Sequence, residues 1–162
     1  IGVDLDYCEG FETTFDKLCK AVSSCDLIVG TSMGGYMASH VGSACGIPFV
    51  ALNPAINPRD SLIRHIGSFV DFGGNNKVLS KAVVASYPDI KTTNGCGLIL
   101  LESGDNIIDP TATKALLDPV YDVRLYEGGS HRFDSLPMVL DEIVAFVEVA
   151  EIVYGFGDGS GD

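Results

Sequence analysis

Basic residues, paired cysteines and long apolar runs are scarce or missing in this sequence of 162 residues. Ten Lys and Arg residues stand against 22 Asp and Glu residues, which gives a net charge of −12. Nucleic acids and anionic membrane surfaces both attract clustered cationic side chains, so this balance predicts neither as a partner. No run approaches the roughly 18 apolar residues of a membrane span. The first ten residues also lack the basic segment of a secretory leader.

The cysteines give no sign of a disulfide framework or a zinc site. There are five of them, an odd number, and no C-x-x-C pair occurs. We therefore expect reduced thiols, a reducing compartment such as the cytoplasm, and no bound metal.

Apolar runs alternate with helical patterns along the chain, and the length fits one domain. The predicted strands are residues 2–6, 25–30, 47–53, 96–103 and 121–127. The predicted helices are residues 11–24, 33–45, 110–117 and 135–153. This alternation is typical of an α/β fold, a mostly parallel sheet with helices on both faces. We interpret residues 1–154 as a single domain and residues 155–162 as a disordered tail.

The most informative stretch is VGTSMGG at residues 29–35, between a predicted strand and a helix of small residues. It contains the pattern G-x-S-x-G, in which a serine occupies a strained strand-to-helix turn. Gly30, Gly34 and Gly35 are expected to make room for that turn around Ser32. The helix N-terminus would present the Met33 N–H to a developing oxyanion. A phosphate-binding loop is the alternative, but no GxxxxGK[ST] or GxGxxG pattern occurs.

A nucleophilic serine needs a base and an acid that orients the base. In this kind of sheet the acid and then the histidine follow later strands. His131 comes directly after the last predicted strand, in the loop EGGSHRF, and is the expected base. His40 and His65 are expected to be structural or solvated.

The orienting acid should follow the strand before that one. Asp105 lies in a glycine turn just past the strand end and is the expected acid. Asp109 precedes Pro110 at a helix start, which is typical of an N-cap, and it stays open as a substitute. Glu102 lies within the predicted strand and is the weaker candidate.

Residues 59–95 are the least regular part and are interpreted as a cap-like insertion. Two short helices are predicted there, within SLIRHIGSFV and KVLSKAVVASY. Five apolar residues are expected to line or cover a substrate site, with an ordinary core role as the alternative. They are Ile63, Ile66, Phe69, Val70 and Phe72.

Four stretches together resemble the YqiA-like small esterases of the α/β-hydrolase superfamily. They are VGTSMGGYMASH at 29–40, IPFVALNPAINP at 47–58, LLESGDNIIDP at 100–110 and EGGSHRF at 127–133. The resemblance implies an α/β-hydrolase-like fold and hydrolysis of acyl esters or thioesters, without metal or cofactor. It implies the roles of nucleophile for Ser32, orienting acid for Asp105 and base for His131.

The sequence departs from the family pattern at its start. The family has a further N-terminal strand whose His-Gly loop supplies a second oxyanion N–H, and this chain begins after that element. Three explanations are open: a native upstream segment, pairing of residues 2–6 beside 25–30, or another chain or copy that completes the sheet. We expect a carboxylesterase- or thioesterase-type serine hydrolase. The alternative is a weak or inactive relative that serves as a structural or binding subunit.

Overall fold

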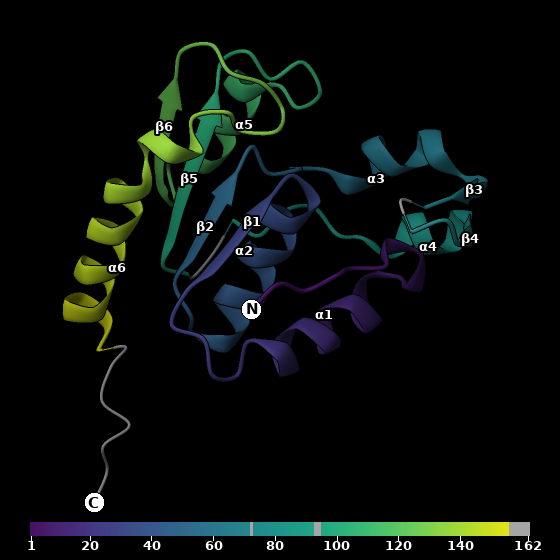
Figure 1. Ribbon diagram of the computed structural model, residues 1–162, viewed down its shortest axis with the longest axis horizontal. Coiled ribbons are helices and arrows are strands. Elements are labelled where there is room, and N and C mark those ends of the chain that lie inside the picture. The colour runs from purple at the N-terminus through teal and green to yellow at the C-terminus, as the bar shows by residue number, and fades with distance from the viewer. Residues whose placement is uncertain (72, 93–94, 156–162) are drawn as a thin grey trace, which may run out of the picture.

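The central feature of the computed structural model is a parallel sheet of four strands in the order β1-β2-β5-β6 (Figure 1). The structure describes residues 1–71, 73–92 and 95–155. The strands are β1 (Ile28–Thr31), β2 (Phe49–Leu52), β5 (Gly97–Glu102) and β6 (Asp122–Tyr126). The predicted α/β architecture with a parallel sheet is confirmed. Within the described ranges, no helix is both long and apolar enough to span a membrane.

Alternating side chains of the central strands fill two cores. β2 and β5 are buried at every position, as expected of inner parallel strands. Because successive side chains point to opposite faces, Phe49 and Ala51 enter one core while Val50 and Leu52 enter the other. The sequence runs from which we predicted these strands are apolar at successive positions because both faces of the sheet are covered.

Helices cover both faces of the sheet (Figure 1). The first core includes residues of α1 (Phe11–Ala21), α2 (Met33–Cys45) and α5 (Pro110–Leu117). The second includes residues of α6 (Leu140–Tyr154), which follows a short 3-10 turn, η3 (Leu136–Met138). The small residues of α2 allow a close approach to β2, because a Cβ at Gly42 would lie 2.8 Å from Phe49 Cδ1.

The N-terminal segment differs from the prediction. Residues 2–6 form no strand, and a 3-10 turn, η1 (Tyr7–Glu9), follows them. The Asp6 side chain accepts a hydrogen bond from Cys8 N and forms an ion pair with Lys77, so the segment is held by its side chains rather than by a ladder. The predicted strand was wrong, and so was the explanation that residues 2–6 pair beside 25–30. Among the described residues, β1 pairs with β2 alone.

The stretch from 59 to 95 contains a hairpin that the sequence pattern did not predict. Its elements are α3 (Pro58–Leu62), η2 (Ile63–His65), β3 (Gly67–Val70), β4 (Asn76–Leu79) and α4 (Lys81–Ser86). β3 occupies the C-terminal part of the first predicted helix, and β4 occupies the N-terminal part of the second. The two strands pair antiparallel. The turn forms because the Asp71 carboxylate accepts Asn75 N at 2.8 Å while Gly74 adopts a φ of +81°.

Three of the apolar residues assigned to a substrate site are exposed. Ile63, Phe69 and Val70 retain 59%, 41% and 62% of their accessible surface, so they are not ordinary core residues. Their role at a substrate site stays a prediction. Phe72 and the tail at 156–162 lie outside the described residues, and the division into one domain with an insertion stays an interpretation.

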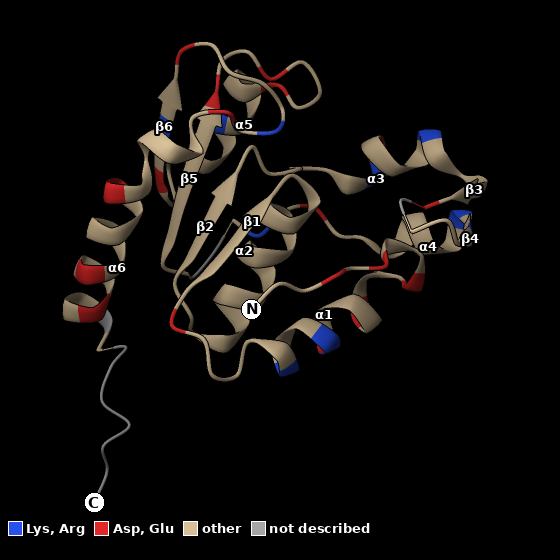
Figure 2. Ribbon diagram, viewed as in Figure 1, with Lys and Arg blue, Asp and Glu red and all other residues tan. Residues whose placement is uncertain are grey.

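Figure 2 shows how charge is distributed over the chain. Lys and Arg residues are scattered over separate elements, while Asp and Glu residues occupy α6, the N-terminal segment and the loops at the upper end of the sheet. Several of the basic residues are paired with carboxylates, as in Lys77–Asp6 and Arg59–Asp89.

Candidate active site

The three predicted site residues meet at one edge of the sheet. Ser32 directly follows β1, Asp105 follows β5, and His131 lies in the loop after β6. The carboxyl ends of parallel strands lie on the same side of a sheet. Open α/β sheets bind their ligands at these strand ends. Residues as far apart as 32 and 131 are therefore neighbours.

Ser32 adopts the strained conformation that its motif predicts. Its φ is 54° and its ψ is −119°, outside the regions that ordinary residues occupy. A Cβ at Gly30 would lie 2.2 Å from Gly34 O, and one at Gly35 would lie 2.9 Å from Gly30 O. A Cβ at Gly34 would meet nothing within 4 Å. The space requirement therefore falls on Gly30 and Gly35, and the expectation that Gly34 shares it was wrong.

Backbone hydrogen bonds hold the turn in place. Ser32 N donates to Leu52 O at 2.9 Å, and Ser32 O accepts from Tyr36 N at 3.0 Å and Ala55 N at 3.1 Å. Met33 is the first residue of α2, where backbone N–H groups have no acceptor within the helix. An N–H donor is therefore present next to the serine.

His131 contacts both of its predicted partners. Its Nε2 lies 2.8 Å from Ser32 Oγ, and its Nδ1 lies 2.8 Å from Asp105 Oδ2. With the Nδ1 proton donated to the carboxylate, the Nε2 lone pair faces the serine hydroxyl. The histidine side chain is 25% exposed and the aspartate side chain 1% exposed. The arrangement thus has a buried carboxylate and an imidazole that is partly exposed to solvent.

The two candidate acids have different partners. Asp105 Oδ1 accepts Ile107 N at 2.8 Å and Ile108 N at 3.0 Å, which leaves Oδ2 for the imidazole. Asp109 Oδ1 accepts Thr111 N and Ala112 N and caps α5, as the following proline predicted. Asp105 is the acid that contacts His131.

The other two histidines do not contact Ser32 in the described structure. His40 is buried against the rings of Phe11 and Tyr36, and its Nε2 lies 3.2 Å from Asp89 O. This burial lowers the pKa of His40 to about 4. His65 is exposed in η2. The expected structural or solvated roles fit these positions.

Glu102, the weaker acid candidate, has a different place in the site. It is the last residue of β5, fully buried, and it accepts backbone hydrogen bonds from Ser130, Asp134 and Ser135. Burial alone would raise the pKa of its carboxyl group, but these hydrogen bonds outweigh burial and lower it. Sequence reasoning missed this contact with the His131 loop. A carboxylate that ends an apolar strand was the available signal.

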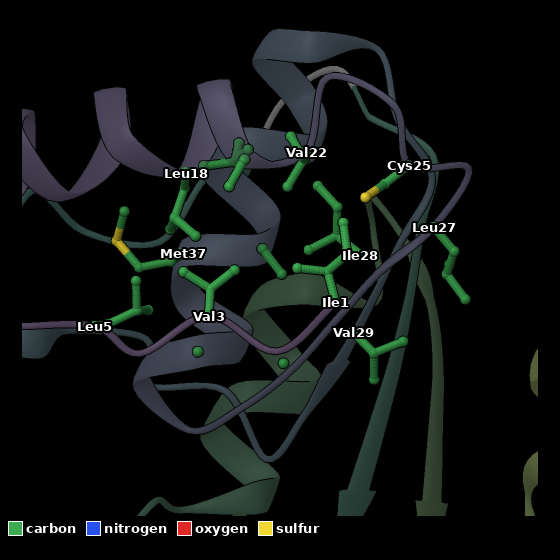
Figure 3. A pocket seen from close by; sticks show the side chains of 15 residues that line it. Ile1, Val3, Leu5, Leu18, Val22, Cys25, Leu27, Ile28, Val29 and Met37 are labelled. Carbon is green, nitrogen blue, oxygen red and sulfur yellow. The ribbon is translucent and has the colours of Figure 1, made fainter.

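An apolar cavity of about 170 Å³ lies along the outer edge of β1 (Figure 3). Side chains of the N-terminal segment, α1, α2 and β1 surround it, and it borders Gly30 and Gly34 beside the serine turn. Its lining includes Val3, Ile28 and Met37, and none of the described residues that line it has a charged side chain. Of the predicted substrate-site residues, the four that the structure describes do not line it; they are Ile63, Ile66, Phe69 and Val70. The described part of the chain also contains no group of three or more potential metal ligands.

Solved structures resemble the fold. Est1E from Butyrivibrio proteoclasticus superposes with a TM-score of 0.62 at 16% identity, covering 86% of this chain and 69% of that chain. Alpha/beta hydrolase domain-containing protein 10 from mouse gives a TM-score of 0.57 at 14% identity, covering 90% and 70%. At these identities the likeness shows the fold, which is that of the α/β hydrolases.

Sequence comparison assigns the family. A "UPF0227 protein" of Shewanella loihica is 30% identical over 132 residues, which are 82% of this chain and 70% of that protein. The chain spans 70% of the length of this relative. It spans 64% and 63% of the next two curated relatives, which is less than two thirds of either. The profile of a family described as "Uncharacterised protein family (UPF0227)" matches residues 10–148. The chain therefore belongs to the UPF0227 family, the YqiA-like group that the sequence motifs resemble.

Proposed function

We propose that this chain carries the catalytic centre of a serine hydrolase that cleaves acyl esters or thioesters. The observation that carries the proposal is the chain of two contacts from Ser32 Oγ through the His131 ring to Asp105 Oδ2, each 2.8 Å long. Nucleophile, base and orienting acid within hydrogen-bond reach define this type of centre on any fold. The hydrolase name of the mouse structural neighbour agrees with the proposed class.

In the first half-reaction Ser32 is acylated. Its Oγ attacks the acyl carbonyl carbon while its proton passes to His131 Nε2. The carbonyl oxygen becomes an oxyanion, which accepts a hydrogen bond from the Met33 N–H. The tetrahedral intermediate collapses and its bond to the leaving oxygen or sulfur breaks. The imidazolium gives its Nε2 proton to that departing oxygen or sulfur, which leaves as an alcohol or a thiol. Asp105 keeps the ring oriented and stabilises its positive charge.

The second half-reaction releases the acid. A water molecule gives a proton to His131 Nε2 and attacks the acyl carbon, and the second intermediate breaks the bond to Ser32 Oγ. The proton on His131 then returns to that oxygen. The acyl group leaves as a carboxylic acid, and the serine is restored. Every proton in this scheme moves through Nε2, which the partial exposure of the His131 side chain leaves accessible.

A fluorescent phosphonate probe tests the proposal, because it reacts with activated serines whatever their substrate. We expect the wild type to gain the mass of one probe, and Ser32→Ala and His131→Ala to gain none. Ser23→Ala is the matched control, since the Ser23 hydroxyl donates to Lys20 O at the end of α1 and should not affect labelling. Labelling that persists in Ser32→Ala contradicts the proposal. A folded wild type that stays unlabelled favours the alternative of a structural or binding subunit.

A further inference from the structure

The loop that carries His131 closes around the carboxylate of Glu102. Glu102 Oε2 accepts Ser130 N at 2.7 Å and Asp134 N at 2.9 Å, and Oε1 accepts Ser135 N at 2.6 Å. The Glu102 carboxylate is therefore hydrogen-bonded to the backbone on both sides of His131. Hydrogen bonds to a charged acceptor are stronger than those between neutral groups.

Glycine makes this close approach possible. Gly129 adopts a φ of +70°, and a Cβ there would lie 2.0 Å from Glu102 Cδ. The backbone thus lies directly on the carboxylate, which retains none of its accessible surface. Within the described ranges Glu102 forms no ion pair with Lys, Arg or His, so the backbone N–H groups stabilise its charge.

Asn53, the residue after β2, contacts the same loop from the neighbouring strand. Its Nδ2 donates to Ser130 O at 2.9 Å, and its Oδ1 accepts Glu102 N at 2.9 Å. Its φ is 42°, in the left-handed region that asparagine tolerates better than most residues. One side chain therefore joins the end of β5 to the His131 loop.

The segment that contains Asn53 also holds the nucleophile. Leu52 O accepts Ser32 N, and Ala55 N donates to Ser32 O. The backbone of Ser32 and the loop of His131 are thus both fixed to residues 52–55. The 2.8 Å contact between Ser32 Oγ and His131 Nε2 joins two chain segments that share this support.

We propose that Glu102 and Asn53 are positioning residues that hold the His131 loop where Nε2 meets Ser32 Oγ and Nδ1 meets Asp105. The inference rests on the proposed function, because it assigns the pair a role in that reaction. Neither side chain is assigned a contact with substrate. Their effect on the reaction passes through the backbone at residues 130–135.

Two variants weaken or remove the proposed contacts. Glu102→Gln keeps the shape, but its amide must turn one N–H group towards a backbone donor, so at least one of three hydrogen bonds is lost. Asn53→Gly removes the side chain and keeps the left-handed backbone available. Glu142→Gln is the matched control, because the Glu142 carboxylate on α6 accepts from the side chains of Arg124 and Tyr126 on β6 instead of from the His131 loop.

The experiment measures phosphonate labelling at several probe concentrations, which separates probe affinity from the maximal inactivation rate. For Glu102→Gln and Asn53→Gly we expect the maximal rate to fall by about 10- to 100-fold, the scale of a misplaced catalytic group, with affinity within about threefold of the wild type. Glu142→Gln should keep both. Urea unfolding verifies that each variant is folded at the assay temperature. If Glu102→Gln does not fold, Asn53→Gly carries the test.

The downfield proton resonance of the His131 Nδ1–H provides a readout that needs no activity. It should be present in the wild type and in Glu142→Gln, absent in His131→Ala, and shifted or lost in both positioning variants. Unchanged labelling rates and an unchanged resonance in the folded variants overturn the inference. An unlabelled wild type overturns the proposed function instead, and the resonance then decides the positioning role alone.

Discussion

Gly30 is the position where a single methyl group should do the most damage to the serine turn. A Cβ there would lie 2.2 Å from Gly34 O, 2.3 Å from Gly34 C and 2.7 Å from Gly35 N. All three are backbone atoms at the start of α2, so no side chain can rotate away. The methyl group of Gly30→Ala must therefore push β1 and α2 apart.

The displacement can be estimated from these distances. Ordinary carbon contacts begin at about 3.5 Å, so the helix start must move by about 1 Å. Overpacking of this kind costs about 1–3 kcal/mol, and we expect the upper end because backbone meets backbone. Ser32 lies between Gly30 and α2, so its Oγ loses the 2.8 Å contact with His131 Nε2. A shift of about 1 Å at a reacting group can cost about 100-fold in rate.

Gly34→Ala is the matched control, because it adds the same methyl group to the same motif. Its Cβ would meet nothing within 4 Å, and Gly34 lies inside α2. Alanine should stabilise the helix by at most about 0.5–1 kcal/mol, the value for a helix interior, because Gly34 lies in the first turn of α2. The assays are urea unfolding and the rate of phosphonate labelling. Wild-type stability and labelling in Gly30→Ala, or equal losses in both variants, would refute the steric reasoning.

Two further predictions concern acids and a buried histidine. Asp105→Asn should lower the labelling rate by about 10²–10⁴-fold. Asp109→Asn should leave the labelling rate unchanged, because asparagine caps helices as well as aspartate. Equal effects of the two variants on labelling would contradict the assignment of Asp105 as the orienting acid. Burial lowers the pKa of His40 to about 4 in the folded chain, from an ordinary value of 6.5. Between these values the unfolded chain binds a proton that the folded chain does not, so stability decreases by about 3 kcal/mol as the pH falls through this window. Urea unfolding at about pH 7.5 and about pH 4.5 should show a smaller loss for His40→Gln than for the wild type, whereas His65→Gln, which alters an exposed ring, should match the wild type.

Much of the site could be predicted because its signals are local. The serine turn needs a strand end, small residues and a helix start, and all of these lie within residues 25–45. The order of Ser32, Asp105 and His131 along the chain follows from where the strands end. The Asp109 cap likewise depends on the two N–H groups that follow it within three residues.

Other features could not be predicted because they depend on distant partners. Residues 2–6 have an apolar alternation, but a strand also needs a ladder partner, and the structure gives them side-chain contacts instead. The β3–β4 hairpin forms through pairing across the turn, which overrides the helical pattern on either side. Glu102 is buried although carboxylates usually lie at the surface. Three backbone N–H groups donate hydrogen bonds to it and offset the cost of removing its charge from water.

The order of residues was enough to predict the alternation of strands and helices, the strained serine turn and the candidate nucleophile, acid and base. These depend on side-chain periodicity and on glycine at fixed offsets, which act within a few residues. The folded arrangement was needed to show that Asp105 rather than Asp109 faces the imidazole, and that Glu102 and Asn53 contact its loop. Ser32 and His131 are 99 positions apart, and the contact between them exists because parallel strands end at a common edge.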